Sequence, residues 1–248
     1  MTVMKIAGIQ MNSAFEDIDS NLKKAQKFIK EAAEHNADTV ILSEMFATGF
    51  SLNPELAQDT HGSIIQFLCA QAKKLKINII AGYMALKADG IKNSAVVIDR
   101  NGRIAAEYSK INLFKQQNEH MVFKSGTAPL IVNLDGVNIA MFICFDLRFP
   151  KIYQSVAKMS DVMVTIAAWP KIRQEHFDTL LKARAIENQC YSAGINQTGS
   201  CNGIMYYGGS AVIAPDGTVV AQEYDSETLI ISTVDTDNVK KLRASFLL

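Results

Sequence analysis

The stretch LIVNLDGVNIAMFIC, residues 130–144, indicates the fold more clearly than any other part of the chain. Its two apolar runs, Leu130–Leu134 and Val137–Ile143, are separated by Asp135-Gly136. An Asp-Gly pair between such runs is typical of a β-hairpin, because the tight turn needs residues that tolerate positive φ angles. The pattern recurs in Ala95–Tyr108 around Asn101-Gly102 and in Ala211–Tyr224 around Pro215-Asp216-Gly217. We therefore expect several antiparallel strand pairs.

Amphipathic helices and further apolar runs surround these hairpins. A helix capped by Asp19 or Ser20 is predicted to bury Leu22, Ala25, Phe28, Ile29 and Ala32. Two more helices are predicted at Ser63–Lys76 and His176–Gln189, the second with Leu180, Leu181, Ala183 and Ile186 facing inward. The other predicted strands are Ile6–Met11, Asp38–Ser43, Asn78–Tyr83, Asp161–Ala167, Cys190–Ile195 and Leu229–Val234.

This mixture of strand–helix units and hairpins predicts an α/β fold with mixed sheets and helices on their outer faces. An all-parallel Rossmann sheet would need a helical crossover between every two strands, which the hairpins do not provide. No linker rich in Pro, Gly or Ser divides the chain, so we expect one domain spanning residues 1–248.

The balance of charges limits the classes of binding partner that we expect, and the cysteines indicate the cellular compartment. The 25 Lys and Arg side chains match 25 Asp and Glu side chains, so nothing favours nucleic acid or a membrane surface as a partner. Met1–Gln10 lacks the pattern of a secretory signal, and no run approaches the roughly 18 apolar residues of a membrane helix. The 4 cysteines have no metal-binding spacing, so we expect a cytoplasmic protein with reduced thiols.

Three polar residues stand at the ends of apolar strands. Glu44 follows the run TVILS, Lys110 follows RIAAEYS, and Cys144 follows VNIAMFI. Ligand sites of α/β folds are built at the carboxyl ends of strands, so these side chains could converge. Each alone has an ordinary explanation, since a Glu can cap a helix, a Lys is usually a surface charge, and a free Cys is often buried.

The sequence around all three residues resembles the nitrilase superfamily of carbon–nitrogen hydrolases. The matching segments are Lys5–Gln10 (KIAGIQ), Ser43–Phe50 (SEMFATGF), Lys110–Phe114 (KINLF), Ile143–Pro150 (ICFDLRFP), Ala183–Gln189 (ARAIENQ) and Asn196–Gly199 (NQTG). Within the superfamily, Met45–Phe50, Asn118–His120, Cys144–Pro150 and Ala168–Pro170 look most like the bacterial ω-amidase branch. Ser43, Asn112 and Phe145 depart from residues more usual in the family, where Pro, His and Tyr are common, but leave every candidate catalytic group in place.

The resemblance implies a four-layer α-β-β-α sandwich, a homodimer, and an amidase with no metal or organic cofactor. It implies hydrolysis of a small non-peptide C–N bond, above all the ω-amide of 2-oxo acids such as 2-oxoglutaramate and 2-oxosuccinamate. Cys144 corresponds to the nucleophile, Glu44 to the proton carrier and Lys110 to the oxyanion stabiliser. Glu119 corresponds to the family's second glutamate, which positions the lysine and the substrate.

A Glu, a Lys and a Cys placed together can carry out amide hydrolysis, because their charges compensate one another. A free thiol has a pKa of about 8.5, so its ionisation near pH 7 needs about 2 kcal/mol of help. Glu44 can accept the proton of Cys144, which leaves one anion instead of two, and Lys110 balances it. The backbone N–H of Phe145 is expected to add a second oxyanion donor.

Substrate-binding residues are predicted less directly. Arg148 lies four residues after the candidate nucleophile, and a guanidinium suits a substrate carboxylate, although a structural ion pair is an equal alternative. Phe114, Phe145 and Trp169 are expected to wall a small pocket, where ordinary packing is again the alternative.

Three other functions remain open on the sequence. A papain-like hydrolase would use His120 or His176 as the base, although the local sequence of that family is absent. Another carbon–nitrogen hydrolase would cleave N-carbamoyl amino acids or aliphatic amides. A non-catalytic binding protein could keep the same fold.

Overall fold

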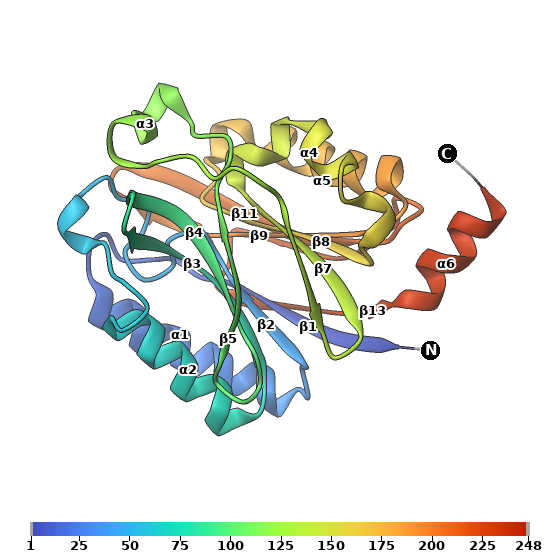
Figure 1. The fold of residues 1–248 in the computed structure, drawn as a ribbon, viewed down its shortest axis with the longest axis horizontal. Helices are drawn as coiled ribbons and strands as arrows, with labels where there is room; N and C mark the ends of the chain where they lie inside the picture. Colours follow the sequence, from blue (N-terminus) through green and yellow to red (C-terminus); the bar gives the residue numbers. More distant parts are fainter. Residues whose placement is uncertain (1, 247–248) are drawn as a thin grey trace.

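The computed structural model describes residues 2–246, which form two mixed β-sheets packed between layers of helices (Figure 1). The first sheet has the order β13 (Thr228–Asp235), β1 (Val3–Gln10), β2 (Thr39–Leu42), β3 (Asn78–Lys87), β4 (Gly90–Ile98) and β5 (Ile104–Ser109). The second has the order β10 (Thr198–Cys201), β11 (Ile204–Ile213), β9 (Tyr191–Asn196), β8 (Val162–Ala167), β7 (Val137–Ile143) and β6 (Leu130–Leu134), with β12 (Val219–Tyr224) paired to β11.

Helices cover the outer face of each sheet. Figure 1 shows α1 (Ile18–Glu34) and α2 (Ser63–Leu75) below the first sheet, and α4 (Pro150–Gln154) and α5 (Gln174–Asn188) above the second. The short α3 (Glu119–Val122) lies at one end of the sheets, and α6 (Thr236–Ser245) projects beyond the other end. The four layers and the mixed sheets are those that the sequence predicts.

Parallel and antiparallel pairs combine in the same way in both sheets. β1, β2 and β3 are parallel neighbours, as are β7, β8 and β9. All the predicted hairpins are present, and β6 and β7 have the predicted bounds and pair antiparallel. The parallel strands bring several carboxyl ends to one edge of each sheet, where polar residues can meet.

The apolar core fills the space between the two sheets. Met4 and Ile6 of β1 face the second sheet, whereas Ala7 and Ile9 pack against the helices, as the alternation along a strand requires. Gly8 lets the sheets approach closely, because a Cβ atom built there would lie 2.1 Å from Cδ1 of Ile195 in β9. A larger residue at position 8 would require the Ile195 side chain to move.

Two details of the helices differ from the prediction. The N-cap of α1 is Asp17, whose side chain accepts a hydrogen bond from the Ser20 N–H, and not Asp19 or Ser20. The face of α5 that packs inward carries Phe177, Leu181, Arg184 and Ala185, while the predicted Ile186 is 47% exposed. The sequence was misleading here because a buried arginine, Arg184, occupies the inward stripe, where it donates to the carbonyl oxygen of Leu147 at 2.5 Å.

Several elements were not predicted at all. β3 and β4 form a further hairpin through the turn at Ala88-Asp89, where the pair Asp89-Gly90 is a hairpin signal that the prediction overlooked. The short β10, α3 and α4, and the C-terminal α6, have too few apolar residues to show a period.

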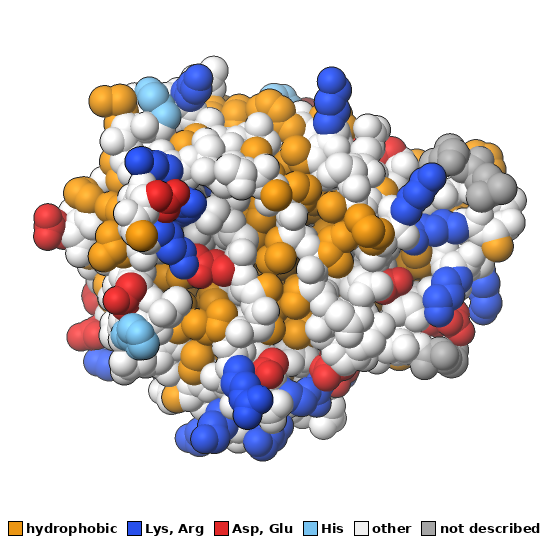
Figure 2. Space-filling model, in the orientation of Figure 1, with side chains coloured by type: hydrophobic (Ala, Val, Ile, Leu, Met, Phe, Trp, Pro, Cys, Tyr) orange, Lys and Arg blue, Asp and Glu red, His pale blue; other side chains and the backbone are white. Residues whose placement is uncertain are grey.

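Figure 2 shows apolar side chains gathered over the middle of the front face, while Lys and Arg side chains collect at its lower edge and along α6. No helix within residues 2–246 is long and apolar enough to cross a membrane.

Candidate active site

Three strand ends place Glu44, Lys110 and Cys144 close together. Glu44 comes two residues after β2, and Lys110 directly follows the edge strand β5 of the same sheet. Cys144 directly follows β7 of the second sheet. The site therefore lies where the edges of the two packed sheets meet, as the strand-end positions predict.

A buried carboxylate cluster consists of Glu44, Asn93, Lys110 and Glu119. The Lys110 Nζ atom lies 2.9 Å from Glu44 Oε1 and 2.8 Å from Glu119 Oε1. The Asn93 side-chain amide donates to the same two oxygens, at 2.6 Å and 3.0 Å. The other oxygens are also bound, since Glu44 Oε2 accepts from the Ala168 N–H at 2.8 Å and Glu119 Oε2 accepts from the Phe114 N–H. The cluster is therefore held rigidly.

The cluster keeps Lys110 charged although the side chain is only 1% exposed. Burial alone would lower the pKa of Lys110, but the carboxylates of Glu44 and Glu119 outweigh burial and raise its pKa. A permanent positive charge is thus available beside the thiol of Cys144.

Cys144 occupies a strained backbone position at the sheet edge. Its φ angle is 46°, in the left-handed region that residues with a Cβ atom seldom adopt. The chain turns there from β7 into a 3-10 helix, Cys144–Arg148, which leaves the side chain half-buried. Burial raises the pKa of the Cys144 thiol, and the Glu44 carboxylate raises it further against the opposing effect of Lys110. The resting thiol is therefore protonated near neutral pH.

Asp146 fixes the turn that carries Cys144. Its carboxylate accepts hydrogen bonds from the Tyr108 hydroxyl at 2.7 Å and from the Ile143 N–H at 3.1 Å. The backbone and side-chain amides of Asn112 donate to its other oxygen at 2.8 Å and 2.9 Å. Burial raises the pKa of Asp146, although these hydrogen bonds oppose the rise. Asn112 thus helps to secure this turn.

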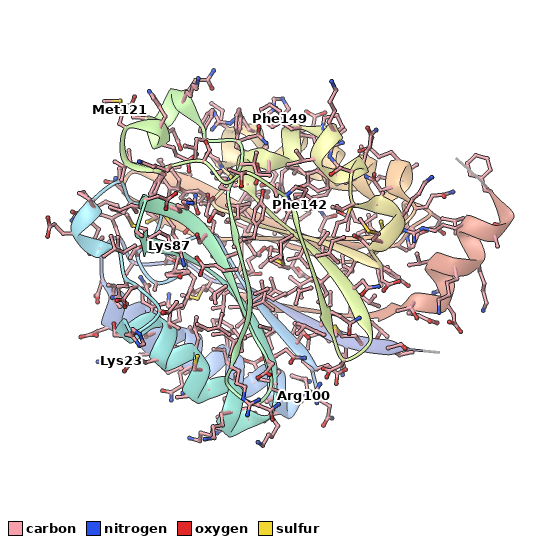
Figure 3. All side chains as sticks on the ribbon, viewed as in Figure 1. Lys23, Lys87, Arg100, Met121, Phe142 and Phe149 are labelled. Atoms are coloured by element: carbon pink, nitrogen blue, oxygen red, sulfur yellow. The ribbon has the colours of Figure 1, made fainter. Side chains whose placement is uncertain are left out.

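A cavity of about 260 Å³ opens onto Cys144 and Lys110. All four predicted binding residues line it, namely Phe114, Phe145, Arg148 and Trp169. The rings of Phe114 and Phe145 lie 4.7 Å apart between centroids, and the Arg148 guanidinium packs 4.8 Å from the centre of the Trp169 ring. Phe149 continues the aromatic row 5.4 Å from Phe145, at the outer surface near α4 (Figure 3).

Asn196 fixes the cavity wall that carries Trp169. Its side-chain oxygen accepts from the Trp169 N–H at 2.7 Å, and its amide donates to the Trp169 carbonyl oxygen at 3.1 Å and to that of Gly208 at 2.8 Å. The neighbouring Ala168 N–H binds Glu44. One backbone segment therefore holds both the Glu44 carboxylate and an aromatic wall of the cavity.

The structure brings together every residue that the sequence analysis selected, and it adds others. Asn93, Asp146, Arg173 and Asn196 were not selected. Asp146 and Asn196 lie inside the quoted motifs and could have been chosen, whereas Asn93 and Arg173 are ordinary polar residues whose place depends on the fold. His120 and His176 do not line the cavity that holds Cys144, so a papain-like arrangement is not present.

The described residues 2–246 contain no group of three or more His, Cys, Asp or Glu side chains placed to hold a metal ion.

Known proteins are similar to this chain in sequence and in fold. Residues 5–244 match the family model described as carbon-nitrogen hydrolase. A 2-oxoglutaramate amidase of Bacillus subtilis is 34% identical over 97% of this chain and 94% of its own. The omega-amidase YafV of Escherichia coli is 33% identical over 89% of this chain and 85% of its own. A solved CN-hydrolase superfamily protein of Xanthomonas campestris is 29% identical and superposes with a TM-score of 0.95 over 99% of this chain and 96% of that chain.

Proposed function

The chain belongs to the carbon–nitrogen hydrolase family of amidases, and on this premise we propose that it hydrolyses the ω-amide of small 2-oxo acids. The proposed substrates are 2-oxoglutaramate and 2-oxosuccinamate, and the products are a dicarboxylate and ammonia. The two relatives named for these activities support this choice.

One observation carries the proposal. A single cavity of about 260 Å³ has a thiol, Cys144, and an ammonium, Lys110, on its lining, and the guanidinium of Arg148 on its wall. A small amide with a carboxylate at its other end matches these groups, since a guanidinium binds a carboxylate through paired hydrogen bonds. The volume suits a short-chain acid better than a peptide.

The reaction begins with transfer of the Cys144 proton to Glu44 as the sulfur attacks the amide carbon. The S–C bond forms while the carbonyl oxygen becomes an oxyanion, which Lys110 and the backbone N–H of Phe145 stabilise. Removal of one such donor typically lowers the rate about 10²–10³-fold. Because the thiol is protonated at rest, the carboxylate must accept its proton during the attack.

The amine then leaves, and water completes the cycle. Glu44 returns the proton to the nitrogen as the C–N bond breaks, which releases ammonia and leaves a thioester on Cys144. Glu44 next takes a proton from water, whose oxygen attacks the thioester carbon, and the thiol is regenerated as the carboxylic acid departs. Glu119 positions Lys110 through the 2.8 Å contact between their charged groups. No metal or organic cofactor takes part in these steps.

The test is ammonia release from a panel of amides by the wild type and Cys144→Ala. The panel contains 2-oxoglutaramate, 2-oxosuccinamate, glutamine, asparagine, an N-carbamoyl amino acid, an aliphatic amide and a nitrile. Turnover of the 2-oxo amides that depends on Cys144 supports the proposal. Turnover of the N-carbamoyl compound or the aliphatic amide alone would contradict the substrate and keep the chemistry, and no turnover would favour a binding role.

We further propose that the enzyme is one domain, acts as a homodimer and resides in the cytoplasm. Ile172 is 87% exposed and Phe149 37% exposed beside the cavity, which favours a contact between subunits there. The free thiols, including the proposed nucleophile, favour a reducing compartment. Light scattering should give twice the mass of the chain, thermal unfolding should show one transition, and cell fractionation should recover the protein with cytoplasmic markers.

A further inference from the structure

Two guanidinium groups reach the cavity from neighbouring connections. Arg148 ends the 3-10 helix Cys144–Arg148 that follows β7. Arg173 ends the 3-10 helix Lys171–Arg173 that follows β8 and precedes α5. Since β7 and β8 are adjacent parallel strands, both side chains arrive at the same edge of the second sheet, and both line the cavity.

Neither guanidinium is neutralised by an acidic side chain. Within residues 2–246, no carboxylate oxygen lies within 4.0 Å of a nitrogen of Arg148 or Arg173. Arg148 instead lies over the ring of Trp169 and contacts His176 Nδ1 at 3.0 Å, while Arg173 lies 5.3 Å from the centre of the Phe114 ring. Glu175 borders a shallow hollow beside Arg148 but does not reach its charge.

The cavity lining has three cations and no carboxylate. Lys110 is paired with the carboxylates of Glu44 and Glu119, so within residues 2–246 the cavity cations without an acidic partner are the two arginines. Burial lowers the pKa of Arg148, and the neighbouring charge of Arg173 lowers it further. Two like charges held close together in this way are an unfavourable arrangement that an anionic ligand relieves.

One carboxylate needs only one of these guanidinium groups. In an ω-amide, position 2 is the carbon next to the carboxylate, so its substituent lies beside the second guanidinium when the first binds the carboxylate. A 2-oxo oxygen there is a hydrogen-bond acceptor, which the N–H groups of arginine require. A 2-ammonium group has no acceptor and repels a guanidinium.

We propose that Arg173 is a specificity-determining residue that makes this cavity favour 2-oxo acid amides and exclude 2-amino acid amides such as glutamine. The inference rests on the proposed function and adds the discrimination at position 2. Arg148 holds the carboxylate, and Arg173 senses the adjacent substituent. The backbone of Arg173 is held at the cavity, because its carbonyl oxygen accepts a hydrogen bond from the Trp169 Nε1–H at 2.7 Å.

The test compares three amides of equal length that differ only at position 2: 2-oxoglutaramate, glutaramate and L-glutamine. We measure kcat/KM for each with the wild type, Arg173→Lys, Arg173→Met and Arg173→Glu. The matched control is Lys171→Met, because Lys171 lies two residues away, places its ammonium 4.2 Å from the centre of the Tyr207 ring and does not line the cavity.

The wild type should prefer 2-oxoglutaramate over glutamine by about 10²-fold or more, since sites that pair with a polar group discriminate strongly against its replacement. Arg173→Met should reduce the preference over both other amides at least tenfold, and Arg173→Glu should raise the relative kcat/KM for glutamine further. Arg173→Lys should keep part of the preference, and Lys171→Met should keep all of it. Equal losses for all three amides would show a merely structural role and overturn the inference.

Binding to Cys144→Ala, measured by calorimetry with the same three amides, separates this inference from the proposed function. Tighter binding of 2-oxoglutaramate than of glutamine, with the difference removed by Arg173→Met, supports Arg173 as the discriminator even if the wild type hydrolyses neither compound. Equal binding of the three amides, or no binding of any, would overturn the inference. Hydrolysis of 2-oxoglutaramate without any dependence on Arg173 would uphold the function and overturn the inference alone.

Discussion

The cations that line the cavity have contrasting surroundings. Lys110 is buried and touches the carboxylates of Glu44 and Glu119, whereas Arg148 and Arg173 are half-buried and have aromatic rings as neighbours instead of acids. A buried charge is stable only when it is paired, so the carboxylate cluster is complete before any substrate arrives. The arginines lack such partners and are suited to complete their contacts with a ligand. The difference predicts that substitutions in the cluster affect both folding and chemistry, while those at the arginines affect binding.

Lys110→Met should have the largest effect because it breaks the cluster. It leaves two buried carboxylates without their cation, which typically lowers the free energy of unfolding by about 3–5 kcal/mol. Amide turnover should fall below detection. Urea denaturation and ammonia release measure the two effects.

Lys87→Met is the control for Lys110→Met. Lys87 lies in the same sheet, and its ammonium is 2.6 Å from Glu107, but it is 29% exposed. Figure 3 places Lys87 at the end of β3, where the pair is only part-buried, so the cost should be smaller than for Lys110→Met, about 1–2 kcal/mol. Equal destabilisation by both variants would remove the distinction between fully buried and part-buried pairs.

Glu44→Gln should separate thiol reactivity from catalysis. Turnover should fall about 10²–10⁴-fold, because the proton acceptor is lost. The pKa of Cys144 should fall, because the nearby negative charge that raises it is removed. Alkylation by iodoacetamide, followed through the Cys144 peptide by mass spectrometry, should therefore reach half its maximal rate at a lower pH than in the wild type. An unchanged or higher midpoint would show that Glu44 does not act on this thiol as an anion.

Arg148→Met tests the other side of the comparison. Because Arg148 has no acidic partner within 4.0 Å in residues 2–246, its loss should change the free energy of unfolding by no more than about 0.5 kcal/mol. KM for the carboxylate-bearing amides should rise about 10–100-fold, since a charge-assisted pair is lost, and kcat should change less. A drop in kcat at unchanged KM would place Arg148 in the chemistry instead.

Tyr108→Phe should have a modest effect on the free energy of unfolding, with a defined pH dependence. It removes one hydrogen bond to the buried Asp146, at a cost of about 1–2 kcal/mol near pH 8. The bond favours the ionised carboxylate, so its loss raises the already raised folded-state pKa of Asp146. A group with a raised folded-state pKa keeps its stability below its unfolded pKa and loses it as pH rises, so the variant's deficit should shrink toward about pH 5. A deficit that grows on acidification would contradict this assignment.

The parts of the site that the sequence predicted are those that local patterns determine. Strand-end positions made Glu44, Lys110 and Cys144 candidates, and the family motifs around them identified them. The mixed sheets with outer helices could be predicted because turn dipeptides and helical periodicity are local properties, whereas the four layers were implied by the resemblance. Contacts between residues that are distant in the sequence cannot be predicted from such patterns. Asn93, for example, joins the carboxylate cluster only because β4 lies between β3 and β5 in the sheet. The prediction of the inward face of α5 was wrong for a related reason. Arg184 can be buried because it donates to the carbonyl oxygen of Leu147, which is distant in the sequence.

The single tryptophan of the chain lies at the cavity. Trp169 is 2% exposed, its ring is covered by Arg148, and its indole N–H is bound to the carbonyl oxygen of Arg173. The tryptophan fluorescence of the molecule, excited selectively over that of its 7 tyrosines, therefore originates at the cavity. Occupancy of the cavity should change this emission without any label, so that stopped-flow mixing can follow substrate capture and product release in real time.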